Sequence, residues 1–383
     1  MQAGESDAMN WEALREEFPV TRNFNFLNHA GHAPLSRRAA DAARRYLRHS
    51  EENAYVHGGF FKQVEKVRAQ IAALLHANPD EIAFTKNTSE GLSFVANGLT
   101  WQNGDNVVIS NAEFPANVYP WQALRARGVQ VRMVLEEDGR IPLERLLEAM
   151  DSRTRVLAIS SVQFASGFRS DLATLGEHCQ SKGVFLCVDA IQSLGAFPID
   201  VNAMKIDFLA ADGHKWLCAP EGSGLFYVRK EIQGHLHPTT IGWLSMKEPF
   251  EFGRYQFEFA DTARRYESGS YNLAGIYGLG GALELVAELG IQAISQRLLD
   301  LTDRLTSGLR DKGYRVISSR VATERSGIVA FISDIHNHEQ LQRHLEVEHR
   351  IVIAVRCNRL RASPYVYNSE REIDQLIECL PRH

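Results

Sequence analysis

Short apolar runs alternate with longer amphipathic segments through the first 230 residues of the chain. The apolar runs have the length of buried strands, and the segments between them carry polar caps and apolar positions at helical spacing. This alternation predicts βαβ units, and therefore a mostly parallel sheet with helices on both faces. The expected strands are 81–85, 106–111, 129–134, 156–164, 184–192, 207–216 and 224–229. The expected helices are 36–52 and 61–75 within the helical region 36–76, followed by 87–99, 121–128, 142–150 and 171–183.

The pattern changes after about residue 270. A long helical stretch at 276–313 is followed by strands at 314–318, 327–333 and 350–356 and by helices at 338–349 and 371–380. We therefore expect an α/β protein with a large domain at 31–260, built on a mostly parallel sheet of the seven-stranded type. Residues 261–383 are predicted to form a connecting helix and a smaller α+β domain, which the segment 1–30 joins.

The amino-acid composition excludes several classes of function for this protein. The 383 residues include 42 basic and 47 acidic side chains, so there is no basic surplus and nucleic acid is not an expected partner. No run of about 18 apolar residues occurs, and we expect no contact with a membrane. The five cysteines contain no CxxC pair, which is typical of reduced thiols. We expect a soluble cytoplasmic protein that acts on a small molecule.

Polar side chains follow several of the expected strands. Asp189 and Gln192 end one strand, and His214 and Lys215 end the next. Ligands of parallel sheets lie beyond the carboxyl ends of the strands, so these side chains are expected to meet at one edge. Three further residues are placed there by the same pattern: Thr88 and Ser89, which open a helix after a strand, and Phe114, which follows the strand at 106–111.

This set of residue types suits pyridoxal phosphate. A lysine is needed to form a Schiff base, and burial of Lys215 would let it lose its proton readily. A carboxylate such as Asp189 keeps the pyridine nitrogen protonated, so that the ring can accept electrons. The helix that begins at Thr88 and Ser89 offers amide donors to a phosphate, and Phe114 offers a flat surface to the ring.

Each of these residues has a simpler explanation when it is taken alone. Lys215 can be a solvated surface residue, and Asp189, Thr88 and Ser89 can be helix caps. Phe114 can be core packing. The prediction depends on all of them reaching the same sheet edge.

The segment VDAIQSLGAFPIDVNAMKIDFLAADGHKWLCAPEGSGLFYVR resembles the signature of class V aminotransferases. These are fold-type-I pyridoxal-phosphate enzymes, and the family includes the cysteine desulfurases. Further matching segments follow in the same order along the chain: FLNHAGHAPLS, FTKNTSEGLSFVANGL, NAEFPANVYPW, SSVQFASGFRSDL, YESGSYNLAGIYGLGGALEL and LRASPYVYNSEREID. The resemblance therefore covers nearly the whole chain.

The resemblance implies a role for each matching position. Lys215 resembles the Schiff-base lysine, Asp189 the partner of the pyridine nitrogen, and Gln192 the residue that bonds the ring hydroxyl. Thr88, Ser89 and His214 resemble the phosphate site. Ser270 resembles the hydroxyl that relatives lend to the phosphate of a neighbouring subunit, which implies a homodimer. Arg361 resembles the arginine that binds the substrate carboxylate. His29 is expected to face the substrate, and a structural role in its loop is the alternative.

Three departures separate the chain from the desulfurases of this family. Phe114 stands where desulfurases usually stack a histidine on the ring. Arg356 and Arg361 are separated by four residues, which is too short for the loop that carries the desulfurase cysteine, so Cys357 is not expected to carry sulfur. Asp212 stands where many relatives bind phosphate with Ser or Thr, and we expect it to turn away. These differences indicate a non-desulfurase branch, similar to the isopenicillin-N epimerases.

The predicted function is that of a pyridoxal-phosphate-dependent aminotransferase acting on an α-amino acid. The alternatives are a C–S or β-elimination lyase, an amino-acid epimerase and a protein that binds the cofactor without catalysis. A dinucleotide-binding protein is less consistent with the sequence, because the glycines at 278–281 follow no strand and suit close helix packing. No metal is expected, since the 14 histidines show no HExxH motif and no Cys/His ligand spacing.

Overall fold

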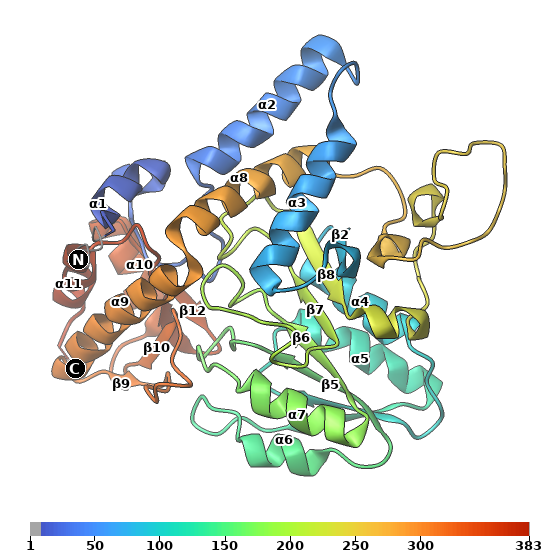
Figure 1. The fold of residues 1–383 in the computed structure, drawn as a ribbon. Coiled ribbons are helices and arrows are strands. Elements are labelled where there is room, and N and C mark those ends of the chain that lie inside the picture. The colour runs from blue at the N-terminus through green and yellow to red at the C-terminus, as the bar shows by residue number, and fades with distance from the viewer. Residues whose placement is uncertain (1–8, 383) are drawn as a thin grey trace, which may run out of the picture.

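A seven-stranded sheet forms the centre of the protein (Figure 1). The computed structural model describes residues 9–382. The strand order is β2-β8-β7-β6-β5-β3-β4, and β8 is the strand that runs antiparallel to its neighbours. The strands are β2 (Ile82–Thr85), β3 (Asn106–Ser110), β4 (Gln130–Val134), β5 (Thr154–Ser160), β6 (Phe185–Asp189), β7 (Phe208–Ala211) and β8 (Gly224–Val228). The predicted α/β fold with a mostly parallel sheet is confirmed.

Helices cover both faces of this sheet. In β7, Phe208 and Ala210 join the hydrophobic cluster on one face, whereas Leu209 and Ala211 join the cluster on the other. Because both faces of the sheet are buried, successive residues of a strand such as β7 are apolar, and its sequence is a continuous apolar run. The helices packed around the sheet are α2 (Arg37–Asn53), α3 (Phe60–Leu75), α4 (Thr88–Gly98), α5 (Tyr119–Ala123), α6 (Leu143–Ala149), α7 (Leu172–Lys182) and α8 (Leu273–Leu289).

A second, smaller sheet has the strand order β12-β13-β10-β9 and carries the C-terminal helices. The N-terminal segment lies beside this part of the molecule, because β1 pairs in parallel with β11. The first eight residues of the predicted 1–30 segment lie outside the described residues. The remaining elements are α1 (Trp11–Leu14), β1 (Asn25–Phe26), α9 (Ile291–Asp311), β9 (Arg315–Val316), β10 (Val329–Ile332), α10 (His338–His349), β11 (Ile351–Val352), β12 (Ala354–Arg356), β13 (Arg359–Ala362) and α11 (Glu370–Cys379).

The long helical stretch expected at 276–313 is divided into two helices. Gly290 lies between α8 and α9 with φ of 76°, a conformation that favours glycine, and the helix axes differ by 79°. A β-carbon at Gly281 would lie 2.6 Å from the carbonyl oxygen of Arg38 in α2, so this glycine permits close helix packing. Within residues 9–382, no single helix is long and apolar enough to cross a membrane, and α8 and α9 meet that test only as a bent pair.

Candidate active site

A cavity of about 250 Å³ opens where the carboxyl ends of β6 and β7 face the start of α4 and strand β13. Its lining joins segments that are far apart in the sequence, from Ala30 to Arg361. Eight of the ten residues singled out from the sequence line it: Thr88, Ser89, Phe114, Asp189, Gln192, His214, Lys215 and Arg361. The edge of the sheet has therefore brought this set together, while His29 and Ser270 lie elsewhere.

Lys215 lies in the turn after β7 and is 9% exposed. Its Nζ lies 5.6 Å from the centroid of the Phe114 ring. Burial lowers the pKa of Lys215, and the positive charges of Arg361 and Arg356 lower it further against the opposing effect of Asp189. A lysine in these surroundings gives up its proton more readily than a solvated one.

Asp189 ends β6 and is 2% exposed. Its Oδ1 accepts a hydrogen bond of 3.0 Å from the amide of Ile191. Burial raises the pKa of Asp189, and the nearby carboxyl of Glu113 raises it further. A cationic ring nitrogen against this carboxylate would supply the positive partner that a buried anion requires.

The first turn of α4 provides hydrogen-bond donors at the other end of the cavity. Asn87 caps this eleven-residue helix by accepting a hydrogen bond from the amide of Glu90 at 2.9 Å. The buried Thr88 Oγ1 has no hydrogen-bond partner within the described part of the chain. A helix start with an unpaired hydroxyl beside it is an environment that fits a phosphate.

Asp212 lies next to this helix start and does not turn away as expected. It lines the cavity, is 5% exposed, and accepts a hydrogen bond of 2.7 Å from the amide of Gly213. Its Oδ2 lies 2.9 Å from Nδ1 of His214. A buried carboxylate needs donors, and of these two donors His214 lines the cavity as well.

Two aromatic side chains form one wall. Phe114 follows β3 and the ring of Phe164 meets it edge to face at 5.2 Å. Phe114 is 43% exposed, so its ring is free to receive a flat ligand. The preceding residue, Glu113, is buried and accepts hydrogen bonds from Ser160, Asn117 and Gln163, which fix the start of this segment.

Arg361 reaches the cavity from β13 and is 1% exposed. Its Nη1 donates to the carbonyl oxygen of Phe164 at 2.8 Å, its Nη2 donates to Asn28 Oδ1 at 3.2 Å, and its Nε is buried without a partner. Burial lowers the pKa of Arg361 to about 9, and Arg356 contributes to this shift. A carboxylate ligand would pair with this buried positive charge and accept a hydrogen bond from the unpaired Nε.

His29 does not face the cavity, contrary to the expectation from the sequence. The side chain is completely buried behind Lys215, with its ring stacked on Tyr365 at a centroid distance of 4.0 Å. Its Nδ1 lies 3.2 Å from the hydroxyl of Tyr367. Burial lowers the pKa of His29 to about 3, so the ring is neutral at ordinary pH and packs in an aromatic cluster.

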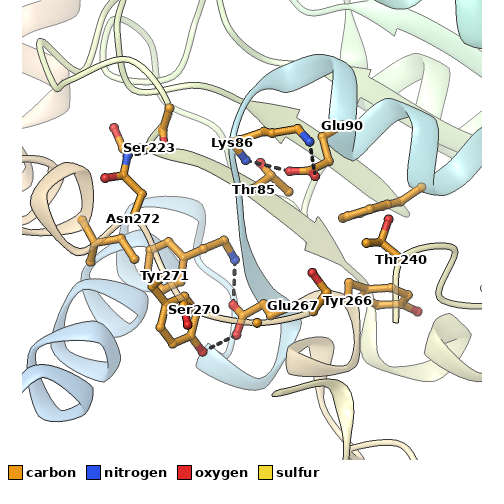
Figure 2. Close-up of a pocket in the computed structure, with 16 residues that line it drawn as sticks. Thr85, Lys86, Glu90, Ser223, Thr240, Tyr266, Glu267, Ser270, Tyr271 and Asn272 are labelled. Carbon is orange, nitrogen blue, oxygen red and sulfur yellow. Dashed lines mark hydrogen bonds and ion pairs between the residues drawn. The ribbon is translucent and has the colours of Figure 1, made fainter. Parts of the chain in front are cut away.

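Ser270 lies in a second cavity of about 420 Å³ (Figure 2). It shares a segment with Tyr271 and Asn272, and the hydroxyl of Tyr271 donates to Glu267 at 2.6 Å. Lys86 and Glu90 form an ion pair at 3.3 Å on the opposite side. Within one chain, Ser270 is therefore separate from the cavity of Lys215, and its role toward a neighbouring subunit stays a prediction.

Several lining residues were not identified as site residues from the sequence: Asn87, Ala116, Phe164, Ile191 and Arg356. Arg356 is the last residue of β12 and directly precedes a hairpin turn, a position that carries no motif of its own. Phe164 ends an expected strand, and an apolar side chain at such a position is typical of core packing. Arg356 enters the cavity from the smaller sheet, whereas the other four residues lie in segments that follow strands of the large sheet.

The donors and acceptors of this cavity fit pyridoxal phosphate. The buried carboxylate of Asp189 lies at one end, the unpaired hydroxyl of Thr88 and the start of α4 lie at the other, and the amine of Lys215 lies under the ring of Phe114. An α/β fold with these features defines the fold-type-I class of pyridoxal-phosphate enzymes.

The chain belongs to the aminotransferase class-V family, whose model matches residues 25–376. Similar curated proteins include a probable cysteine desulfurase of Methanothermobacter thermautotrophicus, 33% identical over 305 residues that cover 78% of this chain and 75% of the relative. The cysteine desulfurase of Enterobacter sp. strain 638 is 31% identical, with 97% of each chain covered.

Solved structures agree with this assignment. The apo cysteine desulfurase of Thermococcus onnurineus NA1 superposes with a TM-score of 0.90 at 25% identity over 97% of each chain. The Escherichia coli cysteine desulfurase CsdA gives a TM-score of 0.88 at 26% identity, with 97% of this chain and 98% of that chain covered. The protein is a pyridoxal-phosphate-dependent enzyme with the class V fold.

Proposed function

We propose that the protein cleaves the Cβ–S bond of a cysteine-like α-amino acid in a pyridoxal-phosphate-dependent reaction. The observation that carries the proposal is that Lys215, Asp189 and Arg361 line one cavity. The names of the similar proteins, cysteine desulfurases, favour a sulfur amino acid over the aminotransferase substrates predicted from the sequence. The lyase alternative is therefore favoured over the aminotransferase prediction.

The cofactor would be held at three points of the cavity. Asp189 would pair with the ring nitrogen, Thr88, Ser89 and His214 would receive the phosphate, and Phe114 would cover the ring. Bound pyridoxal phosphate supplies an aldehyde that links covalently to an amine and a ring that accepts the electron pair released at Cα.

Arg361 and Lys215 act directly on the amino acid. The guanidinium of Arg361 binds the α-carboxylate and fixes the orientation of the Cα–H bond. The amine of Lys215, whose pKa is lowered by burial, takes the α-proton as a general base. The same amine, once protonated, returns a proton to the product.

Cys357 is poorly placed to accept the sulfur atom. It forms a two-residue turn with Asn358, with φ values of 49° and 55°, between paired positions Arg356 and Arg359 of β12 and β13. A two-residue hairpin turn of this kind is held by its flanking strand pairs, and Cys357 does not line the cavity. Sulfur would therefore leave as free sulfide or thiol, and not as a persulfide on this chain.

Transamination, the function predicted from the sequence, is the second candidate. The cavity lining within residues 9–382 contains no cysteine, and an aminotransferase needs none. In that case Lys215 would move the proton from Cα to the cofactor carbon, and the amino group would stay with the cofactor.

We further propose that the enzyme acts as a homodimer in which Ser270 reaches the neighbouring cofactor phosphate. The separation of Ser270 from the cavity of its own chain supports this arrangement. So does the long loop near residues 241–257, which projects from the body of the molecule in Figure 1 and exposes Phe252, Tyr255 and Phe257. Sedimentation velocity tests the dimer, and a monomer at micromolar concentration would contradict it.

The proposed reaction is tested by incubating the holoenzyme with L-cysteine and with a panel of other amino acids, without a keto-acid acceptor. Sulfide with an equal amount of pyruvate supports β-elimination. Conversion of the bound cofactor to its amine form by one amino acid supports transamination instead. Lys215→Ala is the matched control, and a Lys215→Ala protein that still forms a borohydride-reducible link with the cofactor would contradict the site assignment.

A further inference from the structure

Three potential metal ligands from separate segments meet beside the cofactor cavity. They are His32, which precedes α2, His214, which follows β7, and Glu221, which precedes β8. One ligand atom from each lies within 4.8 Å of the others. His32 Nδ1 lies 3.1 Å from Glu221 Oε1, and the rings of His32 and His214 stack with centroids 5.5 Å apart.

The backbone holds these segments together. The amide of Ala33 donates to the carbonyl oxygen of His214 at 3.0 Å, which fixes the histidine segments relative to each other. The turn that carries Glu221 continues through Gly222, whose carbonyl oxygen accepts a hydrogen bond of 2.8 Å from Asn272. A main-chain contact therefore fixes the two histidine segments, and the side chain of Asn272 holds the turn that carries Glu221.

His214 has the outer contact that metal-binding histidines usually have. Its Nδ1 lies 2.9 Å from Asp212 Oδ2, and Asp212 is itself fixed by the amide of Gly213. A carboxylate on one ring nitrogen sets the tautomer and leaves the other nitrogen, Nε2, as the electron-pair donor. Asp212 replaces the hydroxyl residue of many relatives, so this pairing accompanies a departure from the family pattern.

We propose that His32, His214 and Glu221 bind one divalent transition-metal ion, with Zn²⁺ as the expected occupant. Two imidazole nitrogens and one carboxylate oxygen are a ligand set that Zn²⁺ accepts, with water in the fourth position. The side chains of His32 and Glu221 are 58% and 68% exposed, so an ion reaches them from solvent. No motif along the sequence marks this site, because its ligands come from three distant segments.

His214 links this metal site to the cofactor cavity, since it lines the cavity as well. With Nδ1 bonded to Asp212, Nε2 is left either to give its electron pair to the metal or, when it carries a proton, to donate a hydrogen bond to a phosphate oxygen. The two ligands therefore compete, and each lowers the affinity of the other by the same factor. Zn²⁺ should bind more tightly to the apoprotein than to the holoenzyme.

The test is a chelator-competition titration with Zn²⁺ on the purified holoenzyme and on the same protein after cofactor removal. We expect one equivalent of Zn²⁺ per chain, tighter in the apoprotein, and no competition from Mg²⁺, which prefers oxygen ligands. His32→Ala and Glu221→Gln should each weaken binding at least tenfold. Because both side chains are exposed, the thermal unfolding midpoint should not change.

His344→Ala is the matched control, because His344 and His349 form another close histidine pair, with ring centroids 5.1 Å apart on α10. This variant should bind Zn²⁺ as the unmodified protein does. Absence of a one-to-one site in both forms, or binding unchanged by His32→Ala and Glu221→Gln, would overturn the proposal. These outcomes do not depend on which amino-acid reaction the cavity performs.

Discussion

The indole of Trp216 determines which way the side-chain amide of Gln192 lies. Trp216 Nε1 donates to Gln192 Oε1 at 2.8 Å, and Gln192 Nε2 donates to the carbonyl oxygen of Ala30 at 3.0 Å. With the oxygen and one amide hydrogen engaged, the second hydrogen on Nε2 is left for a ligand. Trp216, which directly follows Lys215 in the sequence, thus acts as a positioning residue for the expected contact with the ring hydroxyl.

Trp216→Phe should therefore weaken cofactor binding. Loss of one hydrogen bond that orients a buried amide costs about 1 kcal/mol, which is about a fivefold increase in the dissociation constant of pyridoxal phosphate. Titration of the apoprotein, followed by visible absorbance, measures this constant. Trp101→Phe is the control, because the indole of Trp101 also donates one hydrogen bond, in this case to the backbone carbonyl of Ala96, and lies outside the cavity lining. Equal affinities in both variants would contradict the positioning role.

Arg361→Ala should weaken amino-acid binding much more than cofactor binding. Loss of charge-assisted hydrogen bonds to a carboxylate costs about 3 kcal/mol, so KM should rise about a hundredfold while cofactor content stays near normal. Arg361→Lys should not restore affinity, because an ammonium cannot form the paired contact.

The control for this variant is Arg359→Ala. Arg359 lies on the same strand, forms an ion pair with Glu136 and does not line the cavity. Steady-state kinetics and thermal unfolding of the three variants separate binding from stability. An Arg361→Ala protein with unchanged amino-acid affinity refutes the assignment of this residue.

Burial of His29 should make the protein sensitive to acid. Its pKa is about 3 in the folded protein, against 6.5 in an exposed chain, so between these values the unfolded chain binds a proton that the folded protein does not. Above pH 6.5 both states are neutral and the residue contributes nothing to the pH dependence. As pH falls from 6.5 to 5, this difference lowers the free energy of unfolding by about 2 kcal/mol.

His29→Phe should flatten this pH dependence, whatever its effect on stability at neutral pH. Urea denaturation at pH 5 and pH 7.5 gives the difference for each protein. His344→Ala, a change at a histidine on α10 outside the aromatic cluster, should keep the slope of the unmodified protein. If His29→Phe has the same slope as the unmodified protein, another group accounts for the acid sensitivity.

Cys357→Ser should leave the rate of sulfide release within about twofold of the unmodified protein. The thiol lies in a turn fixed by strand pairing at Arg356 and Arg359, so the reaction has no use for it as a sulfur acceptor. Mass spectrometry of the intact protein after turnover with L-cysteine should find no persulfide at this position. A persulfide on Cys357 together with loss of activity in Cys357→Ser would assign the protein to the persulfide-forming mechanism.

The sequence by itself predicted the class of fold and the main residues of the cavity. Apolar runs between amphipathic segments are a local signal, and parallel strands bring their carboxyl ends to one edge, so Asp189 and Lys215 could be placed together without coordinates. The family resemblance added Arg361, whose strand lies in the smaller sheet. The boundary at Gly290 was missed, because helical periodicity continues on both sides of a single residue with positive φ.

Only the tertiary structure decided where side chains outside these strand ends point. His29 follows a short strand like a site residue, yet packing against Tyr365 places it in the core. Asp212 lines the cavity, where its carboxylate is held by the amide of Gly213 and by the ring of His214. The approach of His32 and Glu221 to His214 depends on three segments packed side by side, and no periodicity or motif along a chain encodes such a contact, since it is stabilised by interactions between residues distant in sequence.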